Sequence, residues 1–138
     1  MVLHDICKTQ AGLFKTMASR NVKMDDFIDM YMESEFCERQ MDSLCDYYQI
    51  ASPDEIIPEI EKEIKITVDP LVKTIDESDA YEIGYIYRYI SRKYGISSKT
   101  LVIIMPYTVI IKLLREYPDA STSDYIQWCH KKIIGKYQ

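Results

Sequence analysis

The stretch DAYEIGYIYRYISRKY, residues 79–94, indicates most clearly which fold class this chain belongs to. Its apolar and aromatic residues recur every three to four positions, which is the spacing of a helix. Tyr81, Tyr85 and Tyr89 share one face, and isoleucines line the adjoining arc. Gly95 is well placed to end the helix in a left-handed conformation. A helix that is apolar or aromatic around most of its circumference is expected at the centre of a bundle.

The composition of the whole chain also favours helices. Its 138 residues are the usual size of one domain, and 47% hydrophobic with 28% charged residues excludes a disordered or collagen-like protein. Four glycines and five prolines leave few turns for a many-stranded β fold. We therefore expect an all-α fold, a single-domain bundle of six to seven short helices that spans residues 1–138.

Further helices are expected on both sides of residues 79–94. Helical spacing predicts them over residues 3–20, from residue 25 onwards, and over residues 36–48, 53–64, 97–105, 107–117 and 121–134. Residues 67–70 break the pattern and are the candidate internal hinge. Two stretches also fit a strand, so a minor β element near 64–68 or 101–105 is the alternative there.

Residues 52–55, Ser-Pro-Asp-Glu, are the clearest local start signal. Ser52 can cap a helix, Pro53 suits the first helical position, and Glu55 can close a capping box. Asn21 is a plausible end for the first helix.

Nothing in the sequence predicts secretion or a membrane span. The first 20 residues show no signal peptide, and the longest apolar run is Leu101 to Met105. We expect a cytoplasmic protein whose four cysteines are reduced thiols. Cys37 and Cys45 lie with Met41 on one apolar stripe, where cysteine acts as a small hydrophobic residue.

No strong catalytic or cofactor-binding motif is present. Four residues near the chain ends are metal-ligand types, but their spacing is not that of a zinc site: His4, Cys7, Cys129 and His130. Carboxylate pairs on single helix faces are more typical of solvated surface than of catalysis. We therefore expect a protein that is not an enzyme and that uses no metal and no cofactor.

Charge is distributed unevenly along the chain. Residues 1–24 carry a net charge of +3, residues 25–82 carry 18 acids and four bases, a net −14, and residues 83–138 carry +6. Segments of opposite charge can simply attract one another within one fold. Alternatively, the acidic block is a face for a basic partner, or the basic part is a face for an acidic one.

Nucleic-acid binding is one function to consider. The C-terminal third is basic and rich in tyrosine and arginine, which can stack on bases and contact phosphates. Against this hypothesis, a pI near 5.0 is far from the basic footprint of a dedicated binder.

The run Ala80-Tyr-Glu-Ile-Gly-Tyr-Ile-Tyr-Arg-Tyr89, followed by Gly95 and Ser97-Ser-Lys99, resembles a group of small, largely uncharacterised bacterial proteins. Their genes lie beside small toxin genes, and they are regarded as antitoxin-type components. Ile90 departs from the group, which has tryptophan there. The resemblance implies an intracellular helical protein that works by binding another protein, such as a toxin encoded nearby.

The leading hypothesis is therefore a non-catalytic protein–protein interaction module, with a nucleic-acid-binding regulator as the alternative. Tyrosine and arginine dominate the hot spots of protein interfaces. The candidate partner-binding residues are accordingly Tyr81, Tyr85, Arg88, Tyr89 and Arg92. Helical amphipathicity favours the core over an interface for the same tyrosine stripe. The sequence does not predict whether the chain forms homo-oligomers.

Overall fold

The structure, a computed structural model, describes residues 3–44, 46–71 and 75–137. Its helices, in chain order, are α1 (Leu3–Ser19), α2 (Met24–Glu33), η1 (Cys37–Met41), η2 (Tyr47–Ile50), α3 (Pro53–Glu61), α4 (Glu77–Tyr94), α5 (Ser98–Ile104), α6 (Tyr107–Glu116) and α7 (Thr122–Tyr137). η1 is a short π-helix and η2 a short 3-10 helix. The described residues contain no strand. The predicted all-α bundle is confirmed.

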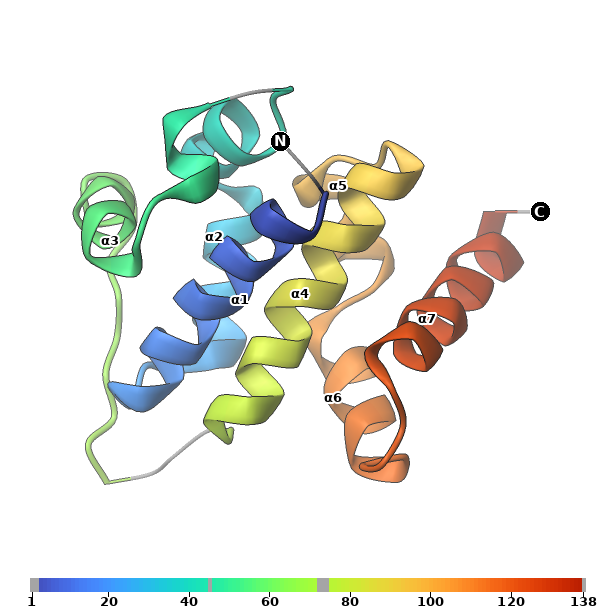
Figure 1. Cartoon of the computed structure of the whole chain (residues 1–138). Helices are drawn as coiled ribbons and strands as arrows, with labels where there is room; N and C mark the ends of the chain where they lie inside the picture. The colour runs from blue at the N-terminus through green and yellow to red at the C-terminus, as the bar shows by residue number, and fades with distance from the viewer. Residues whose placement is uncertain (1–2, 45, 72–74, 138) are drawn as a thin grey trace.

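α4 lies at the centre of the bundle, as its sequence predicts (Figure 1). It runs alongside α1, and this pair has the most extensive contact between any two helices of the described chain. α2 lies behind α1 in this view, α3 stands at one edge, and α7 at the other. Each α-helix contributes buried side chains to one hydrophobic core.

The close approach of α1 and α4 depends on Gly84. A Cβ atom at this position would lie 2.9 Å from the carbonyl oxygen of Gln10 and 3.0 Å from the Cα of Ala11. Both are backbone atoms, which cannot move aside as a flexible side chain can. Glycine therefore lets the two helix backbones touch, and this contact brings Gln10 into the middle of the molecule.

Several predicted helix ends are confirmed. Gly95 follows α4 with φ 64° and ψ 36°, the left-handed conformation that a glycine adopts without strain. Asn21, just after α1, has φ 58°, which asparagine tolerates better than most residues. The Ser97 side chain accepts a hydrogen bond from the backbone N–H of Thr100 and so caps α5.

The helix predicted over residues 36–48 is found only in its first part, up to Met41. Helical backbone ends with η1 at Met41, and η2 begins only at Tyr47. Side chains replace the helical hydrogen bonds between them: arginines of α4 bind the carbonyl groups of residues 41–44, and Asp46 caps η2 at the N–H of Tyr48. Leu44 is consequently exposed. Cys37 and Met41 of the predicted stripe are buried, whereas Cys45 lies outside the described residues.

The start of α3 is confirmed in position but not in mechanism. Ser52 precedes the helix and Pro53 begins it, yet the Ser52 side chain makes no capping hydrogen bond. α3 also ends at Glu61, before the predicted end at residue 64. Glu63, just beyond it, instead accepts hydrogen bonds from the backbone N–H groups of Glu35 and Phe36, at 2.6 and 3.0 Å.

Neither stretch with strand character forms a strand. Residues 98–104 are helix α5. In the stretch 64–68, Val68 makes one isolated antiparallel bridge with Val22. Two backbone hydrogen bonds join residues 67–69 to the loop after α1: Lys23 N–H donates to the carbonyl oxygen of Thr67, and Asp69 N–H donates to that of Asn21. The hinge at 67–70 stays a prediction. No helix in the described part of the chain is both long enough and apolar enough to cross a membrane.

Candidate functional site

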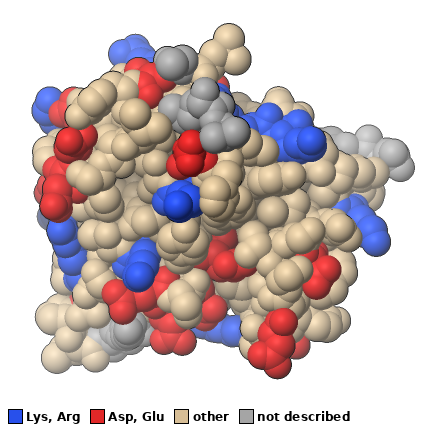
Figure 2. Space-filling view, viewed as in Figure 1, with Lys and Arg blue, Asp and Glu red and all other residues tan. Residues whose placement is uncertain are grey.

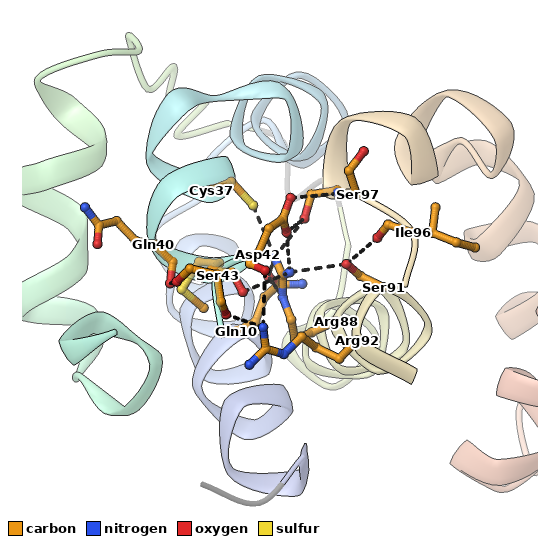
Figure 3. A network of polar contacts seen from close by, with 12 residues as sticks. Gln10, Cys37, Gln40, Asp42, Ser43, Arg88, Ser91, Arg92, Ile96 and Ser97 are labelled. Atoms are coloured by element: carbon orange, nitrogen blue, oxygen red, sulfur yellow. Dashed lines mark hydrogen bonds and ion pairs between the residues drawn. The ribbon is translucent and has the colours of Figure 1, made fainter. Parts of the chain in front are cut away.

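Arg88 lies at the centre of a polar network in the core (Figure 3). Its side chain is fully buried, with 0% of the residue exposed. The guanidinium points from α4 towards η1, α1 and the start of α5. Its partners come from all three: Gln10 of α1, Cys37 of η1, Asp42 just after η1, and Ser98 of α5. One side chain thus connects α4 with α1, with η1 and the residue after it, and with the start of α5.

Gln10 is the main acceptor on α1. Its Oε1 accepts hydrogen bonds from Nε and Nη2 of Arg88, at 2.9 and 2.7 Å, and from the hydroxyl of Tyr31 at 2.9 Å. Its Nε2 donates to the carbonyl oxygen of Gly84 at 2.9 Å. Gln10 therefore uses both its amide oxygen and its amide nitrogen, and these hydrogen bonds fix α1 against α4 next to the guanidinium of Arg88.

Asp42 supplies the negative charge of the network. Its Oδ1 lies 2.7 Å from Nη1 of Arg88, and its side chain is 16% exposed. The carboxylate also accepts hydrogen bonds from the backbone N–H and the hydroxyl of Ser98. A buried ion pair compensates its desolvation cost only when the remaining donors and acceptors are satisfied, and these bonds meet that condition.

Burial sets the protonation of the groups around the guanidinium. Burial raises the pKa of the Cys37 thiol and of the Tyr31 hydroxyl, which keeps both neutral. Burial by itself lowers the pKa of Arg88, but the carboxylate of Asp42, through its charge and its hydrogen bond, raises it, and the net direction is upward. The arginine is therefore permanently charged. This arrangement is suited to holding segments of the chain together.

Arg92, one turn further along α4, holds the segment after η1. Its guanidinium donates to the backbone carbonyl oxygens of Asp42 (3.3 Å), Ser43 and Leu44 (3.1 Å). Gln49 binds the same segment from the other side, with Nε2 donating to the carbonyl oxygen of Ser43 at 2.8 Å. The backbone is thus fixed, while the side chain of Leu44 is 93% exposed.

The tyrosine stripe of α4 lies at the surface. Tyr81, Tyr85 and Tyr89 are each half-buried. The rings of Tyr85 and Tyr89 are nearly parallel, with centroids 6.5 Å apart. The hydroxyl of Tyr85 lies 2.7 Å from Nδ1 of His4 on α1. Partial burial raises the pKa of the Tyr85 hydroxyl. The stripe therefore packs by one edge against the core and presents the other edge to solvent.

A groove of about 350 Å³ runs between α4 and the start of α7. Tyr85, Tyr89 and Tyr94 line it on the α4 side, and Thr122 and Ile126 line it on the α7 side. We call this surface the tyrosine groove. Its lining combines these three tyrosines with one apolar residue, Ile126, and with the polar residues Thr122, Ser123 and Gln127.

The five sequence candidates thus divide into two groups. Tyr81, Tyr85 and Tyr89 remain available for contact with a partner. The assignment of Arg88 as a contact residue is wrong, because its side chain is fully buried and surrounded by its own chain. Arg92 is half-buried, and its guanidinium is directed at carbonyl groups of the 42–44 segment.

Three residues of this region were not among the candidates predicted from the sequence: Gln10, Asp42 and Leu44. A signal existed for Gln10, since it falls among the apolar positions of α1, four residues after Ile6 and three before Leu13. A glutamine in such a place needs a buried partner. Asp42 and Leu44 carried no such signal, because they lie in a segment whose spacing resembles that of a helix.

The residues considered for metal binding and nucleophilic chemistry lie apart. His4 contacts Tyr85, and His130 stacks on Tyr94 with ring centroids 3.7 Å apart. Burial raises the pKa of Cys7 and of Cys129 to about 12, which opposes thiolate formation. Among the described residues, no group of three or more His, Cys, Asp or Glu side chains is arranged to hold a metal ion.

Comparison with known proteins assigns no function to this chain, so a proposal has to rest on the arrangement of its residues. No protein-family model, no curated protein and no solved structure matches this chain.

Proposed function

We propose that this protein is a non-catalytic protein–protein interaction module, of the antitoxin type that neutralises a toxin encoded nearby. The observation that carries the proposal is the tyrosine groove. Tyr85 and Tyr89 expose one edge of nearly parallel rings on a central helix, and Tyr94 extends the aromatic surface. Tyrosine on a rigid element provides a large contact area at a small cost in conformational entropy.

The support of α4 suits this function. A binding surface works best when its backbone is fixed before the partner arrives, since less ordering entropy is then lost. Arg88 and Gln10 tie α4 to α1, and Gly84 lets the two helices touch. The tyrosines therefore project from the most firmly held helix of the bundle.

The acidic block of the sequence adds a preference for a basic partner. Four of its acids are exposed on α2: Asp25, Asp26, Asp29 and Glu33. Burial raises the pKa of Asp29, and repulsion from the three other acids raises it further. A basic partner would relieve this repulsion and would be attracted towards the acidic surface during encounter. The resemblance of residues 80–99 to antitoxin-type proteins points in the same direction.

Nucleic-acid binding has less support. Of the two arginines that suggested it, Arg88 is buried and Arg92 binds backbone carbonyl groups. On the face shown in Figure 2, basic and acidic side chains are interspersed, without the continuous basic surface that phosphates require. Retention on DNA or RNA at low salt, lost at high salt, would revive this alternative.

Co-expression with the product of the neighbouring gene tests the proposal. We expect that product to inhibit growth when expressed alone, and co-expression to restore growth and yield a complex that co-purifies. Tyr89→Ala should weaken the complex about tenfold or more, as expected for an interface tyrosine. Tyr47→Ala is the matched control, since Tyr47 is 63% exposed and does not line the groove.

Circular dichroism of both variants checks that they are folded. The proposal fails if the neighbouring product is not toxic, or if this protein neither binds nor neutralises it. If wild type and Tyr89→Ala bind the partner equally well, the tyrosine groove is not part of the interface.

A further inference from the structure

Among the described residues, none of those that line the tyrosine groove is charged. Besides its three tyrosines and Ile126, the lining consists of the neutral polar residues Thr122, Ser123 and Gln127. A charged group that entered such a groove would lose hydration without gaining a counter-charge. The groove therefore favours a neutral ligand, unlike the acidic surface of α2.

Some of the lining side chains are already held by the rest of the chain. The hydroxyl of Tyr85 lies 2.7 Å from Nδ1 of His4. The ring of Tyr94 is stacked on the ring of His130, with an angle of 8° between the two planes. The hydroxyl of Thr122 donates to a carboxylate of α4. These contacts fix the shape of the groove before a ligand arrives, which lowers the entropy cost of binding.

Other polar groups of the groove remain uncommitted. Four of them make no hydrogen bond with any residue in the described part of the chain: the hydroxyls of Tyr89, Tyr94 and Ser123, and the side-chain amide of Gln127. Each can donate a hydrogen bond. The groove thus combines free donors with aromatic surface, and it suits an apolar ligand that carries unpaired acceptors.

The spacing of the tyrosines adds a geometric criterion. The ring centroids of Tyr85 and Tyr89 are 6.5 Å apart, and the two planes differ by 16°. A polyproline II helix rises about 3.1 Å per residue, so two residues span about 6.2 Å. With three residues per turn, two of every three side chains can face one surface. Residues two apart in such a helix can therefore each pack against one of the two rings.

We propose that the tyrosine groove binds a proline-rich segment of the protein partner, in the polyproline II conformation. Such a segment is neutral, its proline rings are apolar, and its backbone carbonyl groups have no internal hydrogen bonds. Proline also lacks the N–H group for which the groove would have to supply an acceptor. Aromatic-lined grooves are a recurring means of binding such segments. The inference rests on the proposed function, since it names what the partner places in the groove.

Fluorescence anisotropy with defined peptides tests this inference without any toxin. The probe is the fluorescein-labelled peptide Gly-Ser-Pro-Pro-Leu-Pro-Pro-Leu-Pro-Ser with an amidated C-terminus, and its control has alanine in place of every proline. We expect saturable binding of the proline peptide below about 1 mM, and binding of the alanine peptide weaker by about fivefold or more. The two peptides carry the same charge, so a difference between them reports the prolines.

Two variants of the full chain locate the site. Tyr89→Ala should weaken binding of the proline peptide about tenfold or more, because it removes one of the two rings and a donor. Tyr47→Ala is its control, since Tyr47 is 63% exposed and does not line the groove. Gln127→Met should weaken binding about threefold or more, because methionine keeps the length of the side chain but not its donor. Gln127 is exposed, so this variant should keep the fold, and circular dichroism checks it.

Three results would overturn the inference: no binding of the proline peptide up to about 1 mM, equal binding of the two peptides, or unchanged binding by either groove variant. These results differ from a failure of the proposed function. A toxin that binds through Tyr89 while the peptide does not bind would uphold the proposed function and overturn only the proline-rich segment. Peptide binding by a chain that neutralises no neighbouring product would overturn the antitoxin proposal and support the proline-rich ligand.

Discussion

Replacing Arg88 by methionine is the sharpest test of how this fold is held together. Methionine keeps most of the volume of the side chain, so the change removes charge and hydrogen bonds and leaves only a small cavity. Asp42 loses its ion pair, and Gln10 loses two of the three hydrogen bonds to its Oε1.

The magnitude follows from the burial of the two partners. Breaking a buried ion pair by removing one partner costs about 3 to 5 kcal/mol. Asp42 is 16% exposed and keeps its hydrogen bonds to Ser98, which places this case at the lower end. We expect Arg88→Met to lower the free energy of unfolding by about 3 kcal/mol, a large share of the stability of a domain.

The assay is urea unfolding followed by circular dichroism at 222 nm, combined with a double-mutant cycle. Asp42→Asn should also cost about 3 kcal/mol, because it leaves the buried guanidinium without a counter-charge. The double variant should cost about 2 kcal/mol less than the sum of the single variants, since each removes the same pair. Arg39→Met is the control, because Arg39 is 73% exposed in its pair with Glu35 and should lose no measurable stability.

A loss below about 1 kcal/mol for Arg88→Met, or strict additivity in the cycle, would refute the reasoning. Either result would mean that the network contributes little to holding α1, η1, α4 and α5 together.

Three further predictions concern stability. Gly84→Ala should destabilise by about 1 to 3 kcal/mol, since its Cβ would meet the backbone of α1, whereas Gly12→Ala, with open space around its Cβ, should be neutral or stabilising in the same urea assay. Ser97→Ala should cost about 1 kcal/mol by loss of its cap, and Ser52→Ala clearly less, because Ser52 makes no capping bond; equal losses would contradict this. The pKa of Cys129 is about 12 in the folded chain against 9.0 without burial, so the unfolded chain deprotonates first and stability should fall as pH rises from 9 to 12. Urea midpoints across this range should fall less steeply for Cys129→Ala, and parallel curves would show that this thiol is not a cause.

The helices were largely predictable because their signals are local. The spacing of residues 79–94 and the glycine that follows them indicate α4 and its end, and both are found as expected. The helix predicted over residues 36–48 failed after Met41, where apolar spacing fits a helix but backbone carbonyl groups accept hydrogen bonds from side chains of α4. Periodicity cannot reveal this competition, because the competing donors lie more than 40 residues away.

The candidate site was predictable only in part, for the same reason. The tyrosines of α4 were placed correctly on one face, and the sequence left open whether that face is core or surface; the structure shows that it is shared between them. Arg88 was expected at the surface, since a lone arginine is rarely buried. Its burial depends on Gln10 and Asp42, which are 78 and 46 residues away.

By itself, the sequence determined that this chain is an all-α bundle with α4 at its centre, because helix spacing and helix ends depend on residues within a turn or two of one another. The tertiary structure alone decided which polar groups are buried and which apolar ones are exposed. An arginine such as Arg88 can enter the core only when distant segments supply the acceptors that replace water. A second arginine, Arg92, holds the backbone at Leu44, whose side chain stays in solvent.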